Sequence, residues 1–211
     1  MTLSTISLFE MPLVSATQAD AIAALLEDGR ARTAAFVNAH AVNVAHVDPA
    51  FRWALSRADF LLPDGSGVSL AARMQGQRFT ANLNGTDLFV PLCGEAARRG
   101  LSVFFLGSRP GVAGACAHNA ASLVPGLRIA GTRHGYFAAD ENDAVIDEIN
   151  RSGADIVLVA LGVPVQDVWV ARNRHRLNAR LVMGVGAQFD FWSGQVRRAP
   201  QWMRRTGIEW M

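Results

Sequence analysis

Short apolar segments alternate with helix-like segments along almost the whole chain of 211 residues. We predict strands at Thr5–Phe9, Ala35–Asn38, Phe60–Leu62, Ser102–Leu106, Leu127–Gly131, Ile156–Leu161 and Leu181–Val185. Helices are predicted at Gln18–Arg32, Pro49–Arg57, Gly67–Gln75, Thr86–Arg99, Gly111–Leu123, Glu141–Arg151 and Val165–Asn178. Apolar strands that alternate with helices are typical of a parallel sheet with helices on both faces. The sequence therefore predicts an α/β fold.

Composition is that of a globular protein, with 50% hydrophobic and 18% charged residues. No apolar run reaches the ~18 residues that span a bilayer, and the N-terminus lacks the pattern of a signal peptide. Cys93 and Cys116 lack metal-type spacing and are expected to be buried, reduced thiols. We expect a single α/β domain over residues 1–196, and residues 197–211 to begin a basic and aromatic appendage.

All 20 basic residues are arginine, and the chain has no lysine. This composition excludes lysine Schiff-base chemistry, pyridoxal phosphate attachment and a P-loop lysine. An anionic ligand must therefore be held by arginine, backbone N–H groups or helix N-termini. The net charge is only +2, and we expect no nucleic-acid partner.

Polar and glycine-rich residues follow the predicted strands. Ligands of open α/β sheets bind beyond the carboxyl ends of the strands, so these residues are expected to share one rim. They are Asn38–His40, Pro63–Gly65, Gly107–Arg109, His134–Tyr136, Gly162–Gln166 and Gly186–Gln188.

Asp64 stands between a predicted strand and a predicted helix. It could cap that helix, because aspartate is a favoured N-cap residue. It could instead act as a general base that takes a proton from an acceptor hydroxyl.

The segment after the predicted strand Ser102–Leu106 contains Gly107, Arg109 and Gly111. It fits a phosphate-binding loop at a helix N-terminus, with the Arg109 guanidinium as a bidentate donor to the phosphate. It fits a plain tight turn equally well. Neither this segment nor Gly184–Phe189 has the GxGxxG pattern of a dinucleotide site.

Tyr136, the only tyrosine, follows Gly135 at a predicted strand exit. It could be a half-buried aromatic residue or a platform beside a nucleobase or sugar. Gln166, near a helix start, could bond the backbone or read sugar hydroxyls. The histidines form no HxxxH or HExxH pair, and the chain has no DxD, so we expect no metal site and no cofactor. They are His40, His46, His118, His134 and His175.

Taken together, these segments resemble the WecG/TagA/CpsF glycosyltransferase family from about Ala35 to the C-terminus. The resemblance rests on several motifs in a fixed order. They are Asn38, LPDG (Leu62–Gly65), NGTDL (Asn84–Leu88), FFLG (Phe104–Gly107), HGYF (His134–Phe137), GVPVQD (Gly162–Asp167), GVGAQFDFWSG (Gly184–Gly194) and RRAPQW…GIEW (Arg197–Trp210).

The resemblance implies a Rossmann-like core and inverting, metal-independent transfer of a sugar from a UDP-sugar to a polyprenyl-diphosphate-linked saccharide. It implies a cytoplasmic enzyme, peripheral on the inner face of the plasma membrane, that forms a homodimer or homotrimer. Asp64 is then the candidate general base, and Asn38 and Gln166 line the pocket. On the uridine side the matching residues are Gly135, Tyr136 and Asp190, with Gly186 in the same segment.

Two positions depart from the teichoic-acid branch of the family. Phe36 replaces a threonine and Asn82 replaces an arginine, which favours an exopolysaccharide-type member with a different donor or acceptor. Relatives continue beyond the GIEW-like segment with a membrane-docking appendage that is apparently missing here, so we expect weak membrane binding and low activity from this chain. The alternative function is a nucleotide-binding oxidoreductase or a non-catalytic nucleotide-sensing module.

Overall fold

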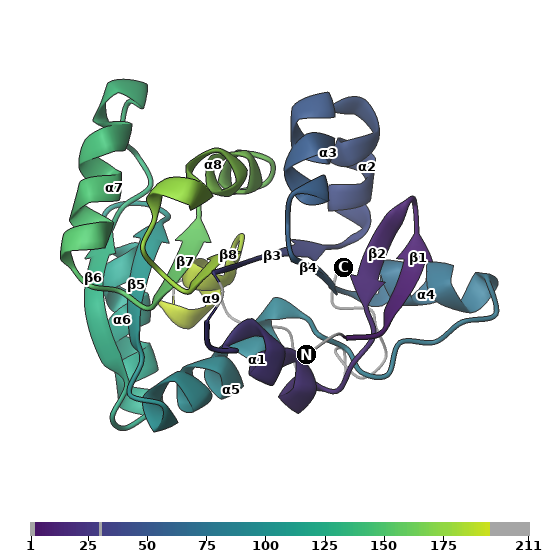
Figure 1. Ribbon diagram of the computed structural model, residues 1–211, viewed down its shortest axis with the longest axis horizontal. Coiled ribbons are helices and arrows are strands. Elements are labelled where there is room, and N and C mark those ends of the chain that lie inside the picture. The colour runs from purple at the N-terminus through teal and green to yellow at the C-terminus, as the bar shows by residue number, and fades with distance from the viewer. Residues whose placement is uncertain (1–2, 30, 195–211) are drawn as a thin grey trace.

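The computed structural model describes residues 3–29 and 31–194. Within them one eight-stranded sheet has the strand order β1-β2-β4-β3-β8-β7-β5-β6 (Figure 1). All neighbouring strands are parallel except β1 and β2, which form an antiparallel hairpin at one edge. The strands are β1 (Thr5–Leu8), β2 (Met11–Val14), β3 (Arg32–Val37), β4 (Phe60–Pro63), β5 (Ser102–Gly107), β6 (Arg128–Arg133), β7 (Ile156–Ala160) and β8 (Leu181–Gly184).

Helices cover both faces of the sheet, which confirms the predicted α/β fold. The apolar side chains of α1 (Gln18–Leu25), α5 (Gly85–Arg98), α6 (Val112–Leu123) and α9 (Gln188–Trp192) share one core cluster. On the other face, α7 (Asn142–Arg151) and α8 (Val165–Asn173) pack on β5, β7 and β8. Beside them, α2 (Ala39–Val47), α3 (Pro49–Ser56) and α4 (Ser66–Met74) pack with the strands from β1 to β4.

The strand β2 and the α-helices α2 and α9 were not predicted. The β1–β2 turn has Phe9 and Glu10 at φ values of 51° and 64°. Such turns normally carry asparagine or glycine, so the sequence lacks the usual signal for a hairpin. The prediction that the first helix runs to Arg32 was also wrong, because the helix ends at Leu25 and Arg32 begins β3.

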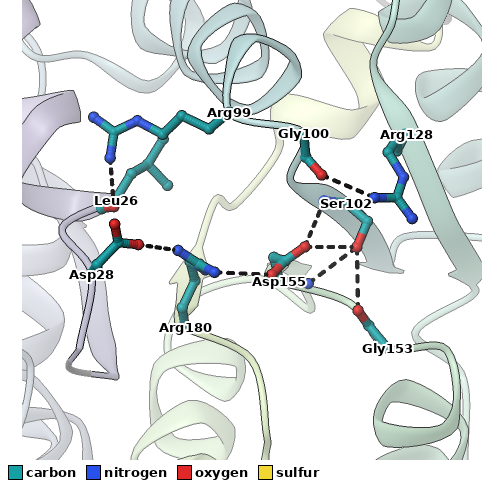
Figure 2. A network of polar contacts seen from close by, with 9 residues as sticks. All are labelled: Leu26, Asp28, Arg99, Gly100, Ser102, Arg128, Gly153, Asp155 and Arg180. Carbon is teal, nitrogen blue, oxygen red and sulfur yellow. Dashed lines mark hydrogen bonds and ion pairs between the residues drawn. The ribbon is translucent and has the colours of Figure 1, made fainter.

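A polar network joins the starting ends of the strands, at the edge opposite to the one where ligands are expected (Figure 2). The Asp155 carboxylate, just before β7, accepts hydrogen bonds from the Ser102 backbone N–H (2.9 Å) and hydroxyl (3.1 Å) at the start of β5. Asp59 accepts equivalent bonds from Thr33, at 2.8 and 3.0 Å. Each carboxylate therefore ties two neighbouring parallel strands together at their starting ends.

Cys93 and Cys116 are buried free thiols, as predicted. Burial raises the pKa of both thiols to about 12, so both are protonated at neutral pH and are weak nucleophiles. In the part of the chain that the structure describes, no helix has the length and apolar character needed to cross a bilayer.

Candidate functional site

The connections from β5 and from β7 leave toward opposite faces of the sheet, so the topology switches between these two strands. These strands are neighbours, but β5 leads into α6 on one face of the sheet and β7 leads into α8 on the other. Ligands of doubly wound sheets bind at such a switch point, in the crevice beyond the strand ends. A cavity of about 480 Å³ lies there. It is lined by Ser108, Arg109, Gly135, Tyr136, Ala160, Leu161, Gly162, Gly186, Ala187 and Asp190.

Five predicted site residues line this cavity from the ends of three parallel strands. They are Arg109 after β5, Gly135 and Tyr136 after β6, and Gly186 and Asp190 after β8. The Tyr136 side chain is 69% exposed, so it is not the half-buried core residue of the alternative interpretation. The predicted residues thus come together although they are far apart in the sequence.

The floor of the cavity is built from closely spaced backbone. A Cβ on Gly107 would lie 2.3 Å from the Ala160 carbonyl oxygen, and the φ of Gly107 is +138°. A Cβ on Gly135 would lie 3.1 Å from the Gly107 Cα. Ser108 N donates to Ala160 O and Gly135 N donates to Ser108 O, each at 2.8 Å. Glycine is therefore required where the loops after β5, β6 and β7 cross.

Helix α6 begins beside the cavity. Its N-cap residue is Gly111, which has no side chain to cap the helix, and its first turn contains no acidic residue. The positive end of the helix dipole is therefore not neutralised by a carboxylate of that turn. Together with Arg109, it provides an electropositive wall suited to a phosphate group.

Gln166 is 2% exposed and lies beneath the cavity. Its side-chain Oε1 accepts a hydrogen bond from the Gly186 backbone N–H at 2.9 Å. Of the two roles left open by the sequence, the structure therefore contains the backbone bond. Contact between Gln166 and a sugar stays a prediction.

Asp64 and Asn38 form a second polar group at the same edge of the sheet. Asn38 Nδ2 donates to Asp64 Oδ2 at 3.4 Å, while Asn38 Oδ1 caps α2 by accepting from Ala41 N at 2.9 Å. Gly65, and not Asp64, occupies the N-cap position of α4, contrary to the capping interpretation. Asp64 does not line the cavity, because its strand β4 lies two strands from β8, or roughly 10 Å at ~4.8 Å per strand.

Asp167 is a buried acid that was not predicted as a site residue, although it belongs to the same motif as Gln166. It is 6% exposed, and burial raises its pKa to about 7. The sequence signal is an acid next to Gln166 in the first turn of the predicted helix. Among residues 3–29 and 31–194, no three His, Cys, Asp or Glu side chains are grouped to hold a metal ion. The metal-free mechanism stays a prediction, and the basic and aromatic appendage predicted to begin at residues 197–211 lies outside the described residues.

The fold and the site together define a doubly wound α/β protein with a backbone-floored cavity at its strand-order switch point, an arrangement typical of nucleotide-binding sheets. Sequence comparison then identifies the family. The chain belongs to the glycosyl transferase WecG/TagA/CpsF family, whose sequence model matches residues 6–211. This match confirms the family expected from the motifs.

Two relatives have names that state an activity, and both are N-acetylglucosaminyldiphosphoundecaprenol N-acetyl-beta-D-mannosaminyltransferases. The protein from Bacillus spizizenii strain W23 is 37% identical over 164 residues, which cover 78% of this chain and 63% of the relative. The protein from Bacillus subtilis strain 168 is 35% identical over 156 residues, covering 74% and 60%. The chain thus spans about three fifths of the length of these relatives.

Proposed function

We propose that this chain is the catalytic domain of an inverting, metal-independent glycosyltransferase. It would transfer a sugar from a UDP-sugar to a saccharide carried on a polyprenyl diphosphate. The proposal rests on one observation. The switch-point cavity and the Asn38–Asp64 pair lie at the same edge of the sheet. Family membership and the acceptor lipid in the names of the two relatives support it.

The donor nucleotide would occupy the cavity. Tyr136 offers an exposed ring as a platform for uracil or ribose, and the Asp190 carboxylate can accept hydrogen bonds from the uracil N–H or ribose hydroxyls. The diphosphate would lie toward Arg109 and the N-terminus of α6. These groups would also stabilise the negative charge that develops on departing UDP, the role that a metal ion has in other enzymes.

The acceptor would approach from the β4 side. Asp64 would take the proton of the acceptor hydroxyl, whose oxygen then attacks the anomeric carbon of the donor sugar. The bond from that carbon to the UDP oxygen breaks, UDP leaves with the electron pair, and the configuration inverts. Asn38 would hold Asp64 in position through its amide N–H. The separation of roughly 10 Å between β4 and β8 leaves room for one sugar unit between the base and the nucleotide.

A lipid-linked acceptor places the reaction at a membrane. We therefore propose a peripheral location on the inner face of the plasma membrane, with residues 197–211 leading to the membrane contact. We also propose that the protein assembles as a homodimer or homotrimer. Phe36 and Asn82 further favour an exopolysaccharide-type donor or acceptor, different from those of the two Bacillus relatives.

The direct test is a screen of UDP-sugars against a polyprenyl-diphosphate sugar acceptor, with wild-type and Asp64→Asn chains compared. We expect transfer by the wild-type chain and at least a hundredfold loss in the variant, because a general base contributes 10²–10⁴-fold. UDP affinity, measured by calorimetry, should be nearly equal in the two, because Asp64 does not line the cavity. Full turnover by the variant would remove Asp64 from the base role.

A thermal-shift comparison of UDP with NAD(P) separates the proposal from the alternative function. Stabilisation by UDP supports a UDP-sugar enzyme. Stabilisation by NAD(P) and not by UDP would favour the oxidoreductase or sensing alternative.

A further inference from the structure

The buried carboxyl group of Asp167 contacts the side chain that holds the cavity loop. Asp167 and Gln166 both lie in the first turn of α8, and the Gln166 side chain favours the ionised form of the Asp167 carboxyl group. A Cβ placed on Gly184 would lie 2.8 Å from Asp167 Oδ1 and 3.0 Å from Gln166 Nε2. The Nε2 end of the Gln166 amide therefore lies on the same side as Asp167, and its Oε1 end lies against Gly186 N.

Chemistry determines which end of this amide faces which partner. The Gln166 oxygen can only accept a hydrogen bond and its nitrogen can only donate, while the Asp167 carboxylate, once ionised above its pKa of about 7, can only accept. A reversed amide would oppose oxygen to the Asp167 carboxylate and would oppose N–H to the Gly186 N–H. Both contacts are repulsive inside the protein, where there is little water to weaken them. Asp167 thus selects the one orientation in which Gln166 can hold Gly186.

We propose that Asp167 is a positioning residue for the donor site, which acts through Gln166 to hold the loop from Gly186 to Asp190 in its binding conformation. This loop lines the cavity through Gly186, Ala187 and Asp190. Gly184 completes the arrangement because a side chain there would displace both partners. The identity of the ligand rests on the proposed function. The arrangement of Asp167, Gln166 and Gly186 does not depend on it.

The test compares four variants of the full 211-residue chain, with UDP as the probe in calorimetry at a pH above the pKa of Asp167. Asp167→Leu removes the acceptor, and we expect the Kd for UDP to rise about tenfold, the factor that corresponds to ~1.4 kcal/mol, or about one net hydrogen bond. Asp167→Asn keeps an acceptor oxygen and should stay within about threefold of wild type. In the double variant Gln166→Leu/Asp167→Leu, binding should be no weaker than in Gln166→Leu alone, because Asp167 acts only through Gln166.

Hydrogen exchange on the ligand-free chain gives a second readout. Amide exchange in the segment 184–190 should speed up in Asp167→Leu and Gln166→Leu, and it should stay near wild type in Asp167→Asn. Wild-type UDP affinity in Asp167→Leu, an Asn variant as weak as the Leu variant, or additive losses in the double variant would overturn the inference. If the wild-type chain does not bind UDP, the proposed function fails, and exchange at this segment decides the inference by itself.

Discussion

Replacing Asp155 with alanine should destabilise the protein without changing the ligand cavity. The Asp155 carboxylate accepts two hydrogen bonds from Ser102 and contacts Arg180 at 3.4 Å (Figure 2). This network lies at the starting ends of β5 and β7, whereas the cavity lies beyond their carboxyl ends.

The magnitude follows from those contacts. A hydrogen bond to a charged group contributes about 1.5–3 kcal/mol when it is buried. Ser102 is buried, but the Asp155 side chain is 28% exposed, so water can reach part of the vacated site and reduces the loss. The Arg180 pair is partly exposed and adds less than about 1 kcal/mol. We therefore expect Asp155→Ala to lower the free energy of unfolding by about 3 kcal/mol, and Tm by roughly 6–12 °C for a chain of this size.

The assay is urea and thermal unfolding of matched variants. Asp155→Asn keeps an acceptor for Ser102 and should lose about 1 kcal/mol, and Ser102→Ala, which removes only the hydroxyl, should lose a similar amount. UDP affinity should be unchanged in all three variants. A Tm within 1 °C of wild type in Asp155→Ala, or weaker UDP binding in a variant of normal stability, would refute the reasoning.

Three further predictions concern the site. Gly107→Ala should lower the free energy of unfolding by at least about 3 kcal/mol or prevent folding, because its Cβ would overlap the Ala160 carbonyl. Gly111→Ala, with open space around the new Cβ, should lower it by only about 1 kcal/mol, and equal unfolding midpoints for the two variants would contradict this. Because the pKa of Asp167 rises from 3.8 to about 7 on folding, the native state holds this proton between those pH values and the unfolded state does not, so stability from this group is present below pH 4 and is lost as pH rises to 7. The free energy of unfolding of Asp167→Asn, measured by urea titration, should therefore fall less than that of wild type across that window. The difference is at most roughly 4 kcal/mol at ~1.4 kcal/mol per pKa unit, and parallel curves for the two proteins would count against it. EDTA should leave transfer intact, and a loss that Mg²⁺ or Mn²⁺ restores would end the metal-free mechanism.

Local sequence was sufficient for the elements whose signals are local. The apolar runs correctly predicted β4, β5 and β7 almost to the residue, and glycine or proline near the helix starts helped to place α3 and α6. The β1–β2 hairpin was missed because Phe9 and Glu10 adopt a turn that normally calls for other residues. Helix α2 was missed because Asn38, counted only as a pocket residue, also serves as its N-cap.

The sequence by itself determined the layered α/β architecture, the family and the residues that follow each strand, because these depend on short-range periodicity and on ordered motifs. It could not determine the order of the strands, since pairing joins segments that are far apart in the chain and depends on how whole faces pack. That order places the loops after β5, β6, β7 and β8 around one cavity and leaves Asp64 two strands away. Only the tertiary structure could bring Gln166 to Gly186, 20 residues further along, and so connect the buried Asp167 to the cavity.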